Sequence, residues 1–174
     1  MGECVLTRRS VVKNEYQKLA DVIVSGSAVT QIDITGLNLV KGEEYVLVST
    51  YLHSGSNPLI LVNDNTTVTN YYTQRLDVNN TVVGGVRYNT SYLGAFDSGY
   101  FSFISTKIKL TNNGYFIWQS NTIRSYNTVN MFMVEWYGTS TFTMTSINKI
   151  SIKSESANGI GIGSRFQLYK VGGV

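Results

Sequence analysis

The sequence predicts an all-β protein, an antiparallel β-sandwich of jelly-roll-like type with a short N-terminal arm. From about residue 20 onward, short apolar runs rich in Val, Ile, Thr, Tyr and Phe alternate with clusters of turn-forming residues. Several runs alternate apolar and polar residues with period two, and no segment has a convincing long helical pattern. The length of 174 residues fits one domain with its own core. We therefore expect an arm over residues 1–20 and a sandwich over residues 21–174.

Eleven strands are predicted in this domain. In residues 104–110, for example, Ile104, Thr106, Ile108 and Leu110 share one face, and the residues between them share the other. The predicted strands cover residues 20–26, 29–37, 44–52, 58–64, 71–78, 81–88, 99–110, 115–120, 130–138, 147–154 and 165–171.

The first 20 residues differ from the rest, because they carry several basic residues and only a brief helix-like stretch around residues 13–19. One interpretation is a frayed or strand-adding N-terminus. The other is an arm that docks the sandwich onto a partner through Arg8, Arg9, Lys13 and Tyr16. Deleting residues 1–18 should then abolish attachment and leave the fold intact.

The composition limits the partners and compartments that we expect. Charged residues make up 14% of the chain, against roughly 25% in an average soluble domain. Asn, Ser and Thr fill the difference with 52 of 174 residues, a surface suited to β-structure and to packing against copies of itself. The net charge of +3 is too small to indicate a nucleic-acid partner.

The sequence also lacks the signals of membrane or secreted proteins. No apolar run approaches the roughly 20 residues of a membrane helix, and the N-terminus lacks the pattern of a secretory signal. We expect synthesis in a cytoplasm and no membrane partner. Cys4 is the only cysteine, which excludes an intrachain disulfide and a cysteine-based zinc site.

A glycine-rich stretch, Gly159-Ile-Gly-Ile-Gly163-Ser164, superficially resembles a phosphate-binding loop. Such loops open a helix, whose N-terminal amides face the anion. Here the following residues, 165–171, alternate as a strand, and no Lys stands in the P-loop position. We interpret the glycines as a bulge or a site of tight packing before the last strand.

No pattern in the sequence predicts catalysis, so we expect a protein that is not an enzyme and has no cofactor or metal. His53 is the only histidine and lies in a Ser/Gly turn, which is typical of a solvated side chain. Asp97 and Glu135 are the acids that we considered as a glycosidase pair, but sequence cannot show that two carboxylates face each other. Residues 63–67 offer oxygen ligands without the spacing of a calcium loop.

Aromatic residues are the remaining candidates for a binding site. Tyr and Trp combine stacking area with a polar group, which serves sugar binding and subunit contacts alike. Core packing is the alternative for most of them. The candidates for glycan or subunit contact are Tyr71, Tyr72, Tyr92, Trp136 and Tyr137.

Four segments resemble proteins of tailed-bacteriophage virions: "IDITGLNLVKGEEYVLV" (32–48), "LILVNDNTTVTNYYTQ" (59–74), "NNGYF" (112–116) and "INKISIKSESANGIGIGSRFQLYKV" (147–171). The resemblance lies in these short sequence segments and in their spacing, and it spans most of residues 20–171. It implies a β-sandwich appendage module, commonly a homotrimer, with a short N-terminal segment that attaches to the virion. It implies no catalytic residues.

Together these observations predict a non-enzymatic structural protein exposed on the surface of a phage particle. The first hypothesis is a head-fibre or capsid decoration protein, with itself and the major capsid protein or another virion protein as partners. The alternative is a tail or baseplate appendage that binds a host surface glycan. A polysaccharide depolymerase and a cellular carbohydrate-binding or adhesin-like sandwich remain further alternatives.

Overall fold

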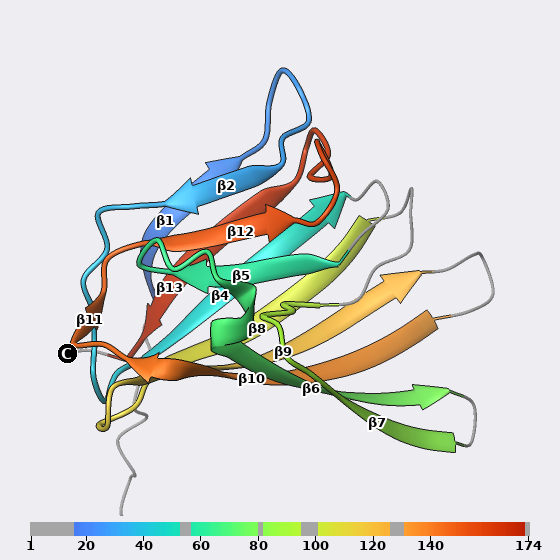
Figure 1. Ribbon diagram of the computed structural model, residues 1–174. Helices are drawn as coiled ribbons and strands as arrows, with labels where there is room; N and C mark the ends of the chain where they lie inside the picture. Colours follow the sequence, from blue (N-terminus) through green and yellow to red (C-terminus); the bar gives the residue numbers. More distant parts are fainter. Residues whose placement is uncertain (1–15, 53–56, 80–81, 95–100, 126–130, 173–174) are drawn as a thin grey trace, which may run out of the picture.

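The computed structural model describes residues 16–52, 57–79, 82–94, 101–125 and 131–172 (Figure 1). In these ranges the regular secondary structure consists of strands and one 3-10 turn, η1 (Val68–Asn70), which confirms the predicted all-β class. The strands are β1 (Tyr16–Ile23), β2 (Gln31–Ile34), β3 (Leu39–Val40), β4 (Glu44–Leu52), β5 (Pro58–Val62), β6 (Tyr71–Asn79), β7 (Val82–Tyr88), β8 (Phe101–Leu110), β9 (Tyr115–Ser125), β10 (Met131–Thr143), β11 (Ser146–Ile147), β12 (Ile150–Ser154) and β13 (Arg165–Val171).

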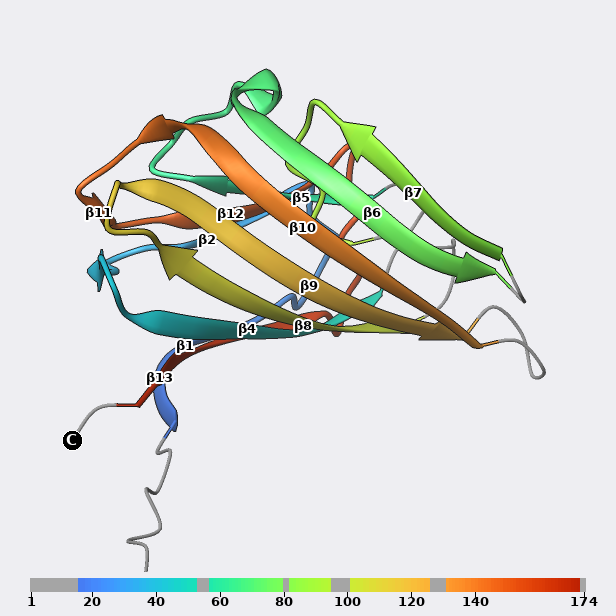
Figure 2. The same cartoon turned by 90° about the horizontal axis from the view of Figure 1, so that it is seen from below.

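Eight strands form one large antiparallel sheet in the order β1-β13-β4-β8-β9-β10-β6-β7 (Figure 2). Neighbours in this order include strands far apart in sequence, since β13 lies between β1 and β4, and β6 lies beside β10. The strand order therefore depends on long-range pairing that no local sequence pattern encodes.

A second layer covers one side of this sheet. It consists of the three-stranded sheet β2-β12-β5 and the short pair β11-β3. Figure 1 shows this layer over one side of the large sheet, while the far ends of β6 and β7 extend past it. We call the covered side of the large sheet the inner face and the opposite side the outer face.

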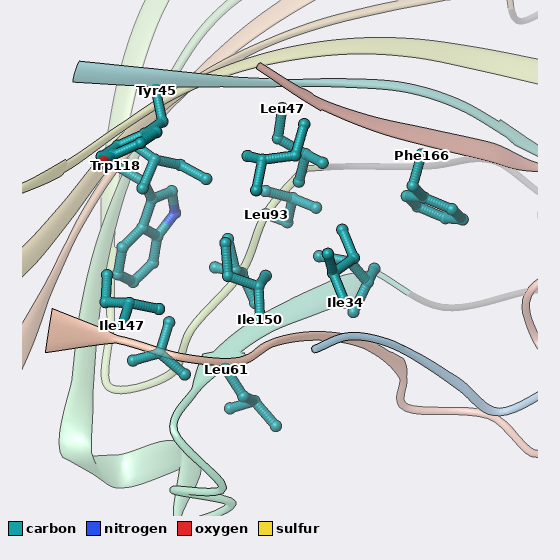
Figure 3. Packing of buried hydrophobic residues seen from close by; sticks show 14 of the residues in the cluster. Ile34, Tyr45, Leu47, Leu61, Leu93, Trp118, Ile147, Ile150 and Phe166 are labelled. Carbon is teal, nitrogen blue, oxygen red and sulfur yellow. The ribbon is translucent and has the colours of Figure 1, made fainter. Parts of the chain in front are cut away.

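The hydrophobic core lies between the two layers (Figure 3). Burying one such apolar side chain completely contributes roughly 1.5–3 kcal/mol, so this layer contact is the main source of stability. The large sheet contributes Tyr45, Leu47, Ile104, Ile108, Phe116, Trp118, Phe166 and Leu168, and the three-stranded sheet contributes Ile32, Ile34, Ile60, Val62, Ile150 and Ile152.

Most predicted strands appear close to their predicted bounds, and β4 and β13 coincide with them. The alternation in β8 is also confirmed, because Ile104, Thr106, Ile108 and Leu110 are all buried. The predicted strand at 147–154 divides in two, since Ile147 pairs with β3 as part of β11 and only Ile150–Ser154 forms β12.

The glycine-rich stretch is a tightly packed turn before β13, as the sequence predicts. A Cβ on Gly159 would lie 1.9 Å from Ser154 Oγ, and one on Gly161 would lie 2.9 Å from the Leu52 carbonyl oxygen. Gly161 also donates its backbone N–H to that oxygen at 2.7 Å. These glycines let the turn approach β4 and the end of β12 closely.

The N-terminal boundary requires a correction. Residues 16–20, which the sequence assigned to the arm, belong to β1, so the sandwich begins at Tyr16. The helix-like stretch is wrong from Tyr16 onward, because β1 adds to the sheet as an edge strand beside β13. Arg165 of β13 holds Asp21 of β1 by two hydrogen bonds of 2.8 and 2.7 Å. Strand pairing and this ion pair outweigh a weak helical propensity.

Candidate functional site: the outer face of the large sheet

The outer face of the large sheet is not covered by any described element (Figure 2). An antiparallel sheet with one side in water normally shows polar side chains on that side. Here most of the exposed large apolar side chains of the described residues share it, and a concentration of this kind marks an interaction surface. They are Tyr16, Ile23, Leu76, Phe101, Phe103, Tyr115, Ile117, Ile123, Met133 and Tyr137.

Three of these residues form a line across the centre of the sheet, which we call the apolar row. Phe103 of β8 pairs with Ile123 of β9, and Ile123 pairs with Met133 of β10. Their relative exposures are 44%, 40% and 67%. Since cross-strand neighbours lie about 5 Å apart, the three side chains form a continuous apolar ridge.

A second line crosses the sheet four residues further along the strands, and we call it the polar row. It consists of Lys107 (β8), Gln119 (β9), Tyr137 (β10), Gln74 (β6) and Arg87 (β7), each paired with the next in the strand register. The row has an aromatic ring at its centre, an amide on each side and a cation at each end. No local pattern predicts this symmetry, because it joins five strands.

The side chain of Tyr137 is fixed by two hydrogen bonds. Its hydroxyl donates to Glu135 Oε2 at 2.7 Å and accepts from Gln119 Nε2 at 3.3 Å. The hydrogen bond to the Glu135 carboxylate is the main cause that raises the pKa of the Tyr137 hydroxyl, so this hydroxyl stays protonated and remains a donor at neutral pH. The ring itself is 41% exposed and available for contact.

Two shallow hollows of about 320 Å³ each lie on either side of Tyr137. Both include Gly138, the residue that follows Tyr137 in β10. A Cβ on Gly138 would lie only 2.0 Å from Trp118 Cζ2 on the inner face, so the indole ring occupies the space where a side chain would be. The first hollow is lined by Glu44, Lys107, Ile108, Lys109, Ile117, Trp118, Gln119, Tyr137 and Gly138, and the second by Tyr72, Thr73, Gln74, Arg87, Tyr137, Gly138 and Thr139.

Arg87, at one end of the polar row, is held by a second predicted aromatic residue. Its guanidinium carbon lies 4.7 Å from the centre of the Tyr72 ring, in a cation–π contact. Tyr72 is half-buried and belongs to the next line of outward side chains, where it pairs with Thr139. Tyr72 and Tyr137, both predicted as contact residues, therefore lie on the outer face and line the same hollow.

The other predicted aromatic contacts do not belong to this surface. Tyr71 and Trp136 are 0% and 1% exposed, so they are core residues and their assignment as contact residues is wrong. Successive side chains of a strand point to opposite faces. Both residues therefore point inward, because each immediately precedes an outward residue, Tyr72 or Tyr137. Tyr92 lies on the inner side, where its ring packs against Trp136 at 5.4 Å and its hydroxyl donates to Glu155 at 3.3 Å.

Of the predicted attachment residues, Arg8, Arg9 and Lys13 lie outside the described residues, as do Cys4, His53 and Asp97. Tyr16 begins β1, is exposed and makes an edge-to-face contact with Tyr169 at 6.3 Å. Glu135, the other acid considered for catalysis, is half-buried beside the polar row and holds the Tyr137 hydroxyl.

Among the described residues, no three His, Cys, Asp or Glu side chains gather as a metal site would require. Within the same ranges, no helix has the length and apolar character needed to cross a membrane. Sequence reasoning missed Lys107, Gln119, Gln74 and Arg87. Alternation places Lys107 and Gln119 on the face opposite the buried neighbours Ile108 and Trp118. Beside Arg87, however, Val86 is exposed and Tyr88 is half-buried, so alternation alone does not single out Arg87.

No protein-family model matches this chain, and no curated protein matches it in sequence. The outer face therefore has to be interpreted from its own chemistry.

Proposed function

We propose that this chain is a non-enzymatic structural protein of a tailed-phage virion, a head-fibre or capsid decoration protein. The observation that carries the proposal is the exposed apolar row, Phe103, Ile123 and Met133, on a sheet face that no described element covers. Large apolar patches on an exposed face are typical of subunit interfaces. The resemblance to phage appendage modules supports the virion setting.

A second copy of the chain is the partner that suits the apolar row. In a closed ring such as a trimer, the ridge of each copy can be buried near the rotation axis, where the copies meet. Apolar burial contributes about 25 cal/mol per Å² before ordering costs are subtracted. Several copies on one particle would add avidity without any further contact.

Attachment to the particle is proposed for the residues that precede β1, including Arg8, Arg9 and Lys13. β1 is an edge strand and Tyr16 is its first residue, so a preceding segment can reach a capsid protein without disturbing the core. Tyr16, exposed at the start of β1, remains a candidate for the same contact.

The self-association test compares three proteins by light scattering after gel filtration. The wild type should have the mass of a trimer. The triple variant Phe103→Ser, Ile123→Ser, Met133→Ser should have the mass of a monomer with an unchanged circular dichroism spectrum. The control variant Gln74→Ser, Gln119→Ser changes the same face outside the apolar row and should remain a trimer. A monomeric wild type, or a triple variant that stays trimeric, would contradict the interface.

The virion role is tested separately with particles from the lysate in which the protein is made. An antibody against the purified chain should label the particle surface in electron micrographs. A chain that lacks residues 1–15 should keep its sandwich and its oligomeric mass but fail to sediment with the particles. Equal sedimentation of the truncated and complete chains would exclude the arm as the anchor.

The second candidate function is a tail or baseplate appendage that binds a host surface glycan. The specific observation in its favour is the polar row, in which Tyr137 lies between Gln119 and Gln74. Exposed aromatic rings beside amide side chains offer both the stacking surface and the hydrogen-bonding groups that sugars require. The apolar and polar rows occupy different parts of the face, so this candidate is compatible with self-association.

A further inference from the structure

We propose that the polar row binds an extended, negatively charged oligosaccharide that lies across strands β8, β9, β10, β6 and β7. Tyr137 would stack against a sugar ring at the centre, Gln119 and Gln74 would hydrogen-bond its hydroxyls, and Lys107 and Arg87 would each pair with an acidic group. This inference rests on the second candidate function, in which the ligand is a saccharide. It adds that the saccharide is negatively charged.

The centre of the site is preorganised. Glu135 and Gln119 fix the Tyr137 hydroxyl from two sides, at 2.7 and 3.3 Å, so the ring does not have to be ordered when a ligand arrives. Fixing a binding group in advance lowers the entropy cost of association. The hollows on each side of the ring leave room for the neighbouring sugars.

The amides supply the polar contacts that a sugar needs. Gln74 is exposed and makes no side-chain hydrogen bond within the described part of the chain, so both its oxygen and its nitrogen are available. Gln119 uses one amide N–H for Tyr137 and keeps its carbonyl oxygen. An amide group can donate to one hydroxyl and accept from another, which matches adjacent hydroxyls on a sugar ring.

The ends of the row determine the charge of the ligand. Lys107 and Arg87 are exposed, the row contains no acid, and neither cation forms a salt bridge with any described residue. Lys109 also lines the first hollow, opposite Glu44 of β4. Glu44 faces Lys109 across the strands, and Glu135 lies two residues from Tyr137 on the same face. The acidic groups of the ligand therefore have to lie toward Lys107 and Arg87, at the two ends of the row, and an uncharged part of the sugar over Tyr137.

The geometry of the row also sets the shape of the ligand. Its end residues are separated by four inter-strand spacings of about 4.8 Å, or roughly 19 Å in total. A single charged sugar cannot reach both cations. A linear chain with acidic groups on separate sugars can contact Lys107 and Arg87 at once, with the aromatic ring between them.

The experiment measures binding of the complete chain to polygalacturonate, a linear polymer with a carboxylate on each sugar, by titration calorimetry. Fully methyl-esterified polygalacturonate is the matched uncharged ligand, and polyglutamate is the charged polymer without sugars. We expect binding to polygalacturonate at least about tenfold tighter than to either control, and weaker at high salt because salt screens exposed charges.

Variants then assign the roles. Tyr137→Ala should weaken binding to polygalacturonate at least about tenfold. Lys107→Gln with Arg87→Gln should reduce the ratio of the affinities for polygalacturonate and for its methyl ester to about one. The control Lys153→Gln removes a cation from β12, in the other sheet, and should change nothing.

The possible outcomes distinguish failure of the charge inference from failure of the proposed glycan-binding function. Equal binding to the charged and esterified polymers, lost in Tyr137→Ala, would overturn the charge inference and keep a glycan-binding protein. Equal binding to polyglutamate and polygalacturonate would show a nonspecific cationic patch and overturn both. Absence of binding to all three polymers would also overturn both and leave the self-association proposal unaffected.

Discussion

The apolar row and the polar row cross the same three central strands on the same face of one sheet, yet they have opposite chemistry. Phe103, Ile123 and Met133 form a ridge without a polar group, whereas the polar row places Tyr137 between amides and cations. The two lines lie four residues apart along each strand, roughly 13 Å. One sheet thus presents a surface suited to another protein and a surface suited to a polar ligand.

The two rows also differ in the packing behind them and in the hollows beside them. Below the polar row, Gly138 leaves its inward space to Trp118, and the two hollows open beside it. Neither of the two hollows beside Tyr137 includes Phe103, Ile123 or Met133. An apolar ridge favours contact with a broad surface, and a ring between two hollows favours a narrower ligand.

The largest effect on stability is expected for the core residue directly behind the centre of the polar row. Trp136 and Tyr137 are neighbours in β10 but point to opposite faces, with exposures of 1% and 41%. Trp136→Ala should lower the free energy of unfolding by about 3–5 kcal/mol, because it leaves a cavity beside Val134, Tyr88 and Tyr92. Tyr137→Ala should cost less than about 1 kcal/mol. Urea unfolding of both variants measures the difference, and equal losses would show that Tyr137 is part of the fold rather than of a binding site.

An intermediate loss of stability is expected when the packing of Gly138 against Trp118, behind the polar row, is changed. Gly138→Ala would force the new methyl group against the Trp118 ring, so one of the two strands or the ring must shift. Overpacking of this kind costs about 1–3 kcal/mol. Thermal unfolding detects the loss, and saccharide binding should fall with it because both hollows change shape.

Gly84→Ala is the matched control for this variant. Gly84 also lies in a strand of the large sheet, but a Cβ there would meet only Asp77 Oδ1, at an ordinary 3.5 Å. Its stability should stay within about 0.5 kcal/mol of the wild type. If the two glycine variants were equally stable, the close approach of Trp118 to Gly138 would not be a constraint.

The smallest effect on stability is expected outside both rows, at the edge strand β1. Hydrogen bonds from Arg165 hold the pKa of the Asp21 carboxyl well below its ordinary value, with Lys18 contributing. Because the folded-state pKa is lowered, this stabilisation is present above the unfolded-state pKa of about 3.9 and is lost as the pH falls below it. Asp21→Asn should therefore reduce stability at pH 6 slightly and show a weaker loss between about pH 4 and pH 2.

Urea midpoints at pH 6 and pH 3 measure this difference between Asp21→Asn and the wild type. The pair is exposed and screened by salt, so added salt should reduce the effect. An identical pH dependence in both proteins would mean that the ion pair does not contribute to holding β1 on the sheet.

Part of the candidate site could be predicted from the sequence. Alternation in "FMVEWYG" places Met133, Glu135 and Tyr137 together on one face, as the structure confirms. Alternation does not state which of two faces is buried, however. This is why Trp136 and Tyr71 were assigned to a contact surface although they belong to the core. Burial depends on where the second layer packs, which is a property of the whole chain.

Local sequence patterns were enough to predict the all-β class, the positions of most strands, the alternation within them and the structural role of the glycine-rich turn. These features follow from local propensity and from the two-residue period of a strand. Long-range packing set the strand order, the addition of β1 to the sheet edge, and the register that aligns Lys107, Gln119, Tyr137, Gln74 and Arg87. The reason is physical: pairing between distant strands is selected by burial and hydrogen bonding over the whole fold, so residues far apart in the sequence meet only after the sheet has formed.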